Sequence, residues 1–443
     1  MYFDSRRSTV LATNGMVATS QPLAAMAGLQ VLMDGGNATD AAITAAAALN
    51  VVEPNSTGVG GDLFALVWNE KEKSVRAING SGRAAAASDI EELTSQGYRS
   101  MPGAGPYSVC VPGTVHGWET LRAECGTMPL SRLLEPAIRY AEGGFPVSEV
   151  IAWQWENNLP KLRMYPSGEE MMVDGNAPKK GDRVRFPTLA TTLRAIAEGG
   201  CEAFYHGPIA EKMASFVQEH GGWLTVEDLA AHTSDWDEPI ATDYRGVTCW
   251  ECPPNGQGIA ALEALNIAEG FDIAAMGAQS ADAYHHLIEA MRLAFADAYR
   301  YVADPRVVDV PTEQLLSKEY AAQRRELMDP RKAMMTAPYG QPIPGGNTVY
   351  VSAGHLQLIS NMVDHGMDPQ QAINALRFMV GNDQALLEEG VSPDTARELQ
   401  QRGHKLGLMA GRSRVSIGGA RSSPATTAPA CCRAAPNPAR TAQ

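Results

Sequence analysis

The chain has 443 residues, of which 44% are hydrophobic and 19% are charged, a globular composition that excludes a chain disordered throughout. Its formal net charge of −14 disfavours nucleic acid or an anionic membrane surface as the main partner, because no long basic stripe offsets it. No apolar run approaches the roughly 18 residues that a membrane-spanning helix requires, so we expect no membrane span.

The region up to residue 83 predicts helices framed by strands: a strand at 15–20, helices within 21–36 and 37–54, and strands at 63–68 and 74–79. Asn37 can cap the second helix, and Asp40 lies in its first turn. The loop "NSTGVGGD" is followed by neither a GK[ST] motif nor a helix, so it is not a phosphate loop. We expect its glycines to allow tight backbone packing, and a second Gly-flanked loop, "INGSGRAA", to present Arg83.

Residues 108–335 are predicted to be mostly helical, since "LSRLLEPAIRYAEGG", "PIAEKMASFVQEHGG" and similar stretches each end at glycine. Short strands are expected in "PIATDYRGVTCWECPP". His285 and His286 lie side by side on a long amphipathic helix, where we expect surface exposure or partial burial and no shared metal. Ser81 lacks the strand–elbow–helix context of a hydrolase serine, and we expect no catalytic role for it.

The cysteines and the start of the chain bear on metal sites and location. Cys249 and Cys252 form a CxxC without a second pair at zinc-ribbon spacing, so no metal site is expected. Seven cysteines, an odd number, together with a start that has no apolar core of signal-peptide length, predict reduced thiols in a cytoplasmic chain.

Two features near the end of the chain stand out. Residues 411–443 hold five arginines and no carboxylate, and they are crowded with Ala, Pro, Ser and Thr, which predicts a disordered tail. A basic interaction arm is the alternative for that tail. Upstream, "APYGQPIPGG" supplies a proline- and glycine-rich loop directly before Asn347 and Thr348.

Thr348 opens the short alternating run "TVYVSA", in which it shares one face with Tyr350 and Ser352. A threonine hydroxyl is a poor nucleophile at neutral pH. If the peptide bond before it is cut, its own α-amine, with a pKa of roughly 7.7–8.0, can act as the base. From spacing alone a structural role is the simpler interpretation, because β-branched residues favour strands in any case.

Several long motifs resemble the γ-glutamyltransferase (γ-glutamyltranspeptidase) family in family order. They include "QPLAAMAGLQVLMDGGNATDAAITAAAALNVVEPNSTGVGGD", "VPGTVHGWETLRAECGTMPLSRLLEPAIRYAEGGFPVSE" and "DYRGVTCWECPPNGQGIAALEALNI". The resemblance covers residues 15–348 and resumes at "GHLQLISNMVDHGMDPQQAINALRFMV" and "GVSPDTARELQQRGH". The form "NTVY" differs from the "TTH" of glutathione-cleaving members and is similar to the oxamate amidohydrolase branch.

The resemblance implies an α/β protein with the αββα four-layer sandwich of the N-terminal-nucleophile hydrolases. It further implies self-cleavage before Thr348, which would divide a large-subunit-like region, 1–347, from a truncated small-subunit-like region, 348–410, that stays interlaced with it. Arg83 matches the arginine that grips the substrate α-carboxylate, a role that its rigid fork of donors suits. The implied partner is a small amide or γ-glutamyl compound, with no cofactor or metal, and processed pairs could form a homodimer.

The resemblance breaks after Thr348, because "NTVYVSA" runs straight into "GHLQLISNMVDHG". In the family a long segment lies between these two motifs and supplies partner strands, a second hydroxyl and a Gly-Gly oxyanion hole. We therefore expect part of the central sheet to be missing. Unpaired buried backbone groups would cost about 1–3 kcal/mol each, and a lost oxyanion donor about 10²–10³ in rate. Two hypotheses follow: an amidohydrolase or acyltransferase that uses Thr348, and an unprocessed, catalytically inactive family member.

Overall fold

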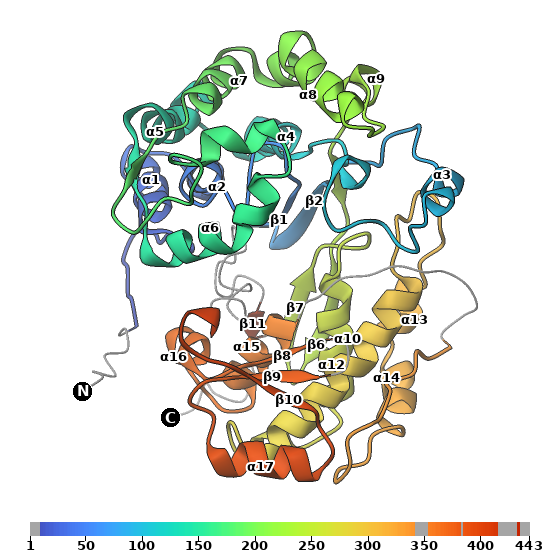
Figure 1. Ribbon diagram of the computed structural model, residues 1–443. Helices are drawn as coiled ribbons and strands as arrows, with labels where there is room; N and C mark the ends of the chain where they lie inside the picture. The colour runs from blue at the N-terminus through green and yellow to red at the C-terminus, as the bar shows by residue number, and fades with distance from the viewer. Residues whose placement is uncertain (1–8, 342–352, 382–383, 415–431, 435–443) are drawn as a thin grey trace.

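The computed structural model describes residues 9–341, 353–381, 384–414 and 432–434. Figure 1 shows two packed parts, which follow each other along the chain. The first contains α1 (Pro22–Met33), α2 (Ala38–Val52), β1 (Leu63–Asn69), β2 (Ser74–Gly80), α3 (Ile90–Ser95), η1 (Pro106–Ser108), α4 (Thr114–Cys125), α5 (Leu130–Gly143), β3 (Phe145–Pro146), α6 (Glu149–Leu162), η2 (Pro166–Met171), β4 (Arg183–Val184), α7 (Pro187–Tyr205), α8 (Pro208–Glu219), α9 (Val226–Ala230) and β5 (Asp235–Asp237).

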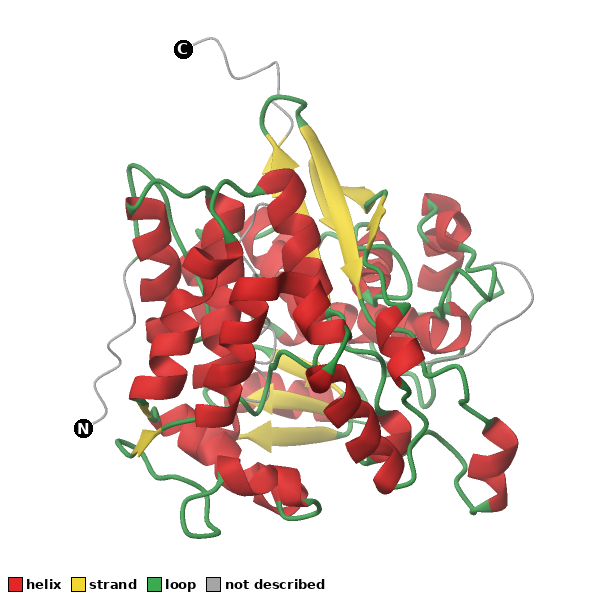
Figure 2. Cartoon of the chain, turned by 90° about the horizontal axis from the view of Figure 1, so that it is seen from above, coloured by secondary structure: helices red, strands yellow, loops and turns green. Residues whose placement is uncertain are grey.

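The second part contains β6 (Ile240–Tyr244), β7 (Val247–Glu251), α10 (Gly258–Ala268), α11 (Ile273–Met276), α12 (Ala281–Tyr301), α13 (Thr312–Leu315), α14 (Lys318–Arg325), α15 (Ala353–Val363), α16 (Pro369–Asn374), β8 (Phe378–Val380), β9 (Ala385–Glu388), α17 (Pro393–Gln401), β10 (Leu406–Met409), η3 (Gly411–Ser413) and β11 (Cys432–Ala434). Helices make up most of both parts and flank the short strands, as the view in Figure 2 shows.

The strands of the described residues form small sheets, with the orders β1-β2-β5, β11-β7-β6, β10-β9-β8 and β3-β4. β1 and β2 pair as an antiparallel hairpin from Leu63↔Gly80 to Asn69↔Ser74, which confirms the two strands predicted there. β6 and β7 form a second hairpin, with Tyr244 opposite Val247. The residues at and after the end of β2 contact Asn255, which follows β7, so this loop lies where the two parts meet.

Each part has its own apolar core. The first core is built from α2, α4, α5, α7 and their neighbours and includes the fully buried Trp118 and Trp155. The second is built around α10 and α12, and it also takes in Leu356, Phe378 and Leu399 from beyond the predicted nucleophile. The segments that follow residue 352 are therefore packed into the same core as α12.

Local signals predicted α2 correctly. Asn37 and Asp40 form a capping box, each side chain accepting from the other residue's backbone N–H. The buried Asp40 also accepts from the backbone N–H groups of Thr127 and Met128, so the first turn of α2 is tied to the loop before α5. Alanines then allow a close approach, since a Cβ on Gly28 of α1 would lie 2.8 Å from the Ala41 carbonyl oxygen.

Three predictions are wrong in detail. Residues 15–20 form no strand, because no neighbouring strand pairs with them in the described residues. His285 and His286 are buried, with 0% and 5% of their surface exposed, because other segments cover the polar face of α12. Within the predicted disordered tail, Cys432–Ala434 pair with Val247–Cys249 of β7 as strand β11.

Candidate active site

The loop after β2 carries Arg83, and its backbone is held against the segment before α4. The Val111 N–H donates to the Arg83 carbonyl oxygen at 2.9 Å. A Cβ on Gly82 would lie 1.4 Å from the Val111 carbonyl oxygen, and one on Gly113 would lie 1.7 Å from that of Gly80. Only glycine fits at these two crossings, so the sequence fixes the path of the loop while leaving the Arg83 side chain exposed.

The Gly-rich loop "NSTGVGGD" packs beside the same crossing. The N–H groups of Gly113 and Thr114 both donate to the Gly61 carbonyl oxygen, at 2.8 and 3.0 Å. The Thr114 hydroxyl donates to the Asp62 carbonyl oxygen at 3.0 Å. The loop thus uses its backbone to dock onto the start of α4, as expected from its glycines.

A polar network ties the end of β2 to the second part of the molecule. The Ser81 hydroxyl donates to the Asn79 side-chain oxygen at 2.6 Å and accepts from the Asn255 amide at 2.9 Å. The Asn79 amide in turn donates to the Asn255 side-chain oxygen at 2.9 Å. Ser81, next but one to Arg83 in the chain, therefore links the end of β2 to Asn255 of the second part.

An ion pair between Asp304 and Arg306 lies close to Arg83. Arg306 binds both carboxylate oxygens of Asp304, at 2.9 and 2.7 Å, and lies 3.6 Å from Asp235. These hydrogen bonds from Arg306 lower the pKa of Asp304, and the charge of Arg83 lowers it further. Within the described residues Arg83 itself has no ion-pair partner. The charges of Asp304 and Arg306 offset each other, so the Arg83 guanidinium remains available to bind an anion.

His232 lies close enough to Arg83 and Arg306 to feel their charges, and it is 8% exposed. Burial lowers its pKa to about 4, and the nearby His116, Arg83 and Arg306 act in the same direction. The imidazole is therefore neutral at pH 7. It packs edge to face with His116, with ring centroids 5.5 Å apart.

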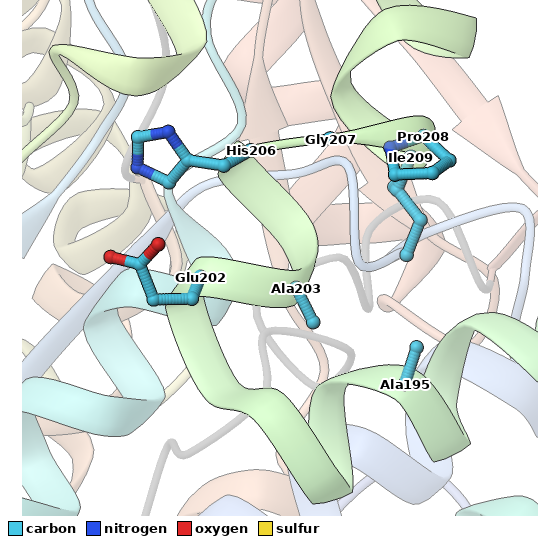
Figure 3. A pocket seen from close by; sticks show the side chains of 7 residues that line it. All are labelled: Ala195, Glu202, Ala203, His206, Gly207, Pro208 and Ile209. Atoms are coloured by element: carbon cyan, nitrogen blue, oxygen red, sulfur yellow. The ribbon is translucent and has the colours of Figure 1, made fainter.

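The described surface includes two hollows of different size. One of about 300 Å³ lies beside the polar network and includes Asp237, Pro253 and Pro254 in its lining. A larger one of about 540 Å³ lies between α7 and α8, where the side chains of Ala195, Ala203 and Ile209 point toward one another and those of Glu202 and His206 extend to the other side (Figure 3). The larger hollow contains none of the residues around Arg83, so it is not the candidate site.

Thr348 lies outside the described residues, which end at Gln341 before it and resume at Ala353 after it. The structure therefore does not place the predicted nucleophile relative to Arg83. Within the described residues no group of three or more His, Cys, Asp or Glu side chains could hold a metal ion. No described helix is both long and apolar enough to cross a bilayer.

The sequence singled out Arg83 as a candidate but gave no indication that Asn255, Asp304 and Arg306 lie near it. Asn255 lies 174 residues from Ser81, and nothing in the local pattern "PPNGQG" indicates that contact. The spacing of Asp304 and Arg306 does suggest a local ion pair, yet it carries no sign of proximity to Arg83. Long-range packing alone brings these residues together.

Comparison with known proteins gives one consistent result. A family model described as gamma-glutamyltranspeptidase matches residues 24–354 and 344–442. A glutathione hydrolase-like proenzyme of Bacillus subtilis is 38% identical over 320 residues, which cover 72% of this chain and 61% of the relative. The oxamate amidohydrolase proenzyme of Klebsiella pneumoniae is 36% identical over 351 residues, which cover 78% of this chain and 65% of the relative. The chain thus spans less than two thirds of the length of either relative.

Solved structures agree with this result. The cephalosporin acylase from Bacillus halodurans superposes with a TM-score of 0.85 at 36% identity, covering 92% of this chain and 91% of that one. The gamma-glutamyltranspeptidase of Helicobacter pylori gives a TM-score of 0.72 at 30% identity, covering 77% of this chain and 100% of that one. The mixed helix-and-sheet fold is the fold of these neighbours.

Proposed function

The chain belongs to the gamma-glutamyltranspeptidase family, as its motifs predicted, and from that premise we propose that it is an amide-cleaving hydrolase or acyltransferase. The observation that carries the proposal is the family match, which runs through Thr348 and includes the loop that presents Arg83. Arg83 supports it independently, because this exposed guanidinium lies on a backbone fixed by glycine crossings and has no ion-pair partner among the described residues.

The proposed chemistry begins with cleavage of the bond between Asn347 and Thr348. The freed α-amine of Thr348 takes the hydroxyl proton, and the oxygen attacks the substrate amide carbonyl. The leaving amine departs with a proton and an acyl-enzyme ester remains. Water then releases the acid, or a second amine takes the acyl group, and either step restores the hydroxyl.

Arg83 would bind an anionic group of the acyl donor. Its planar fork of N–H donors can hold a carboxylate at two points, which orients the substrate as well as attracting it. The substrate class that fits is a small amide with a carboxylate, such as oxamate, or a γ-glutamyl compound such as glutathione. The names of the relatives include both a glutathione hydrolase-like proenzyme and an oxamate amidohydrolase proenzyme.

We place the chain in the αββα four-layer architecture, with part of the central sheet missing after Thr348. Its alignment with an acylase proenzyme of Pseudomonas sp. extends over 499 positions, more than the 443 residues of the chain, so the relative has positions with no counterpart here. A catalytically inactive, unprocessed member is therefore the second candidate. Regions 1–347, 348–410 and 411–443, a cytoplasmic location and a homodimer of processed pairs are parts of the same proposal.

Denaturing electrophoresis with intact-mass measurement tests the proposal. The enzyme should give two fragments, one of which begins at Thr348, and it should hydrolyse a γ-glutamyl amide or oxamate. The Thr348→Ala variant, purified in parallel, should remain a single chain and be inactive. A wild-type chain that stays intact at 47.3 kDa and cleaves neither substrate would establish the inactive alternative.

A further inference from the structure

The segment before the predicted cleavage bond is held along one side of α12. The Met334 N–H donates to the Glu289 carboxylate at 2.8 Å, and Arg292 donates to the Met334 carbonyl oxygen at 2.8 Å. Further along, the Gly340 N–H donates to the Asp297 carboxylate at 2.5 Å. These bonds bind the backbone of the segment, so they fix its path irrespective of its side chains.

The contacts occur in the same order along the segment and along α12. Glu289 and Arg292 bind Met334, and further along the helix Asp297 and Tyr301 bind Gly340, where the Tyr301 hydroxyl donates to the carbonyl oxygen at 2.7 Å. The segment therefore runs along α12 in the direction of the helix. We call Glu289, Arg292, Asp297 and Tyr301 of α12 the rail, because their side chains bind the backbone of Met334 and Gly340.

The far end of the rail is a buried ion pair. Arg324 of α14 lies 2.8 Å from the Asp297 carboxylate, and the two side chains are 3% and 0% exposed. Arg324 also donates to the Pro338 carbonyl oxygen at 2.5 Å. In Figure 1, α12 and α14 lie side by side in the second part of the molecule, and the segment between α14 and the grey trace passes beside them.

A second buried carboxyl group lies near this ion pair. Glu263 of α10 is 1% exposed. Burial raises the pKa of Glu263 well above its ordinary value, and the nearby Asp297 carboxylate raises it further, which disfavours a second negative charge beside Asp297. The fit is also steric, because a Cβ on Gly340 would lie 2.0 Å from the Tyr320 hydroxyl oxygen.

A buried ion pair is a poor way to gain stability alone, since apolar residues of similar volume often stabilise a core as well or better. Here the Asp297 carboxylate also accepts from the Gly340 N–H, and the Arg324 guanidinium also donates to the Pro338 carbonyl oxygen. The ion pair therefore fixes the position of the backbone at residues 338–340.

We infer that Asp297, Tyr301 and Arg324 are positioning residues for self-cleavage, because they fix the chain at Gly340, eight residues before Thr348. This inference rests on the proposed function. Fixing Gly340 limits the distance that Thr348 can lie from it to roughly 29 Å, at no more than about 3.6 Å per residue. The anchor thus reduces the volume that the scissile bond can explore in the precursor.

The chain offers a matched pair of variants for the test. Tyr301→Phe removes one hydroxyl that donates to the Gly340 carbonyl oxygen at 2.7 Å. Tyr284→Phe removes a hydroxyl from the other end of α12 that donates to the Leu376 carbonyl oxygen, also at 2.7 Å. Both tyrosines are buried in the same core, with 2% and 4% of their surface exposed. The two variants should therefore lose similar thermal stability.

The measurement is the rate of appearance of the two fragments after synthesis, with the melting temperature of each variant measured alongside. Tyr301→Phe should slow self-cleavage about two- to tenfold, the range of one net hydrogen bond, whereas Tyr284→Phe should leave the rate unchanged. Asp297→Asn should slow cleavage further, and amide hydrogen exchange at Gly340 should speed up in both rail variants.

Equal cleavage rates in Tyr301→Phe and Tyr284→Phe would overturn the inference while leaving the proposed function intact. The inference would also be overturned if both variants cleaved themselves more slowly in proportion to their loss of melting temperature. A wild-type chain that never cleaves would overturn the proposed function, and the positioning role with it.

Discussion

Replacing His404 by glutamine tests a buried histidine pair that links the end of the described chain to α12. The His285 Nε2–H donates to the Asp329 carbonyl oxygen at 2.8 Å, which leaves Nδ1 of His285 as an acceptor. His404 Nε2–H donates to that Nδ1 at 2.7 Å. Charging both rings would place two N–H groups face to face, so the geometry disfavours a pair in which both histidines are protonated.

The pKa shifts agree with this geometry. Burial lowers the pKa of His285 to about 4 and that of His404 to about 3, and nearby cationic side chains, Arg292 and Arg402 for His404, act in the same direction. A histidine whose pKa is depressed in the folded state stabilises the fold fully above its unfolded pKa of about 6.5. That contribution is lost as the pH falls from 6.5 towards the folded pKa, because the unfolded chain binds protons that the folded chain refuses.

The magnitude follows from linkage. For each proton that the unfolded chain binds and the folded chain does not, the free energy of unfolding falls by about 1.4 kcal/mol per pH unit. Each histidine therefore lowers the free energy of unfolding by at most about 2 kcal/mol between pH 6.5 and pH 5. Glu289, whose Oε1 lies 3.9 Å from His404 Nδ1, opposes this loss, because burial raises the pKa of its carboxylate. A comparison between variants is therefore more informative than the absolute pH dependence of the wild type.

Urea unfolding at pH 7 and pH 5 measures the effect. A glutamine amide at 404 can still donate to His285 but does not titrate, so the stability lost between pH 7 and pH 5 should be smaller in His404→Gln by about 1–2 kcal/mol. His206→Gln, at an exposed position, controls for the substitution itself. If His404→Gln loses as much stability as the wild type over this pH range, His404 is not held neutral by the fold and the reasoning fails.

Three further predictions concern the site and the join between the subunit-like regions. Thr348→Ala should remain one chain of about 47.3 kDa by intact mass, and appearance of the same two fragments would exclude Thr348 as the nucleophile. Arg83→Ala should raise KM for carboxylate-bearing amides by about 10-fold or more, the range of a charged hydrogen bond, with KM for a neutral amide as the unchanged control. Asp364→Asn should lower the melting temperature and loosen the two fragments from each other, because the buried Asp364 accepts from Tyr244 at 2.7 Å and pairs with Arg245 at 2.6 Å across that join. The same change at the exposed Asp394 should have no measurable effect, and equal losses at both positions would contradict the assignment.

The features that the sequence predicted well are those determined by neighbours in the chain. The capping box at Asn37 spans three residues, and the hairpin of β1 and β2 joins strands separated by one short turn. The predicted strand at 15–20 failed for the complementary reason. A strand requires a partner, and local β-propensity does not supply one.

The burial of His285 shows a limit of helix periodicity. Polar side chains recur along α12, which in isolation indicates a face turned to water. In the structure that face is covered, because Glu289, Asp297 and Tyr301 bind the backbone of residues 333–340 and His285 binds His404. Polar groups with complete hydrogen bonding can be buried, and the sequence pattern cannot distinguish them from exposed ones.

The candidate site shows the same division. Arg83 could be singled out as a candidate from its motif, whereas the residues packed near it could not. Asn79 meets Asn255 across 176 residues, and Arg306 meets Asp235 from a separate loop. Such contacts depend on how the two parts of the molecule pack, which no short motif records.

The described residues from 353 onward are packed onto the rest of the chain. His355 lies 2.7 Å from Glu251 of β7, and the Gln357 amide donates to the Phe378 carbonyl oxygen at 2.8 Å in the core around α12. These contacts join residues on both sides of Thr348. If part of the central sheet is missing, as we propose, a folded and cleaved protein without turnover would locate the defect there. Self-cleavage and substrate turnover must accordingly be measured separately, since we propose that the rail along α12 serves the first and Arg83 serves the second.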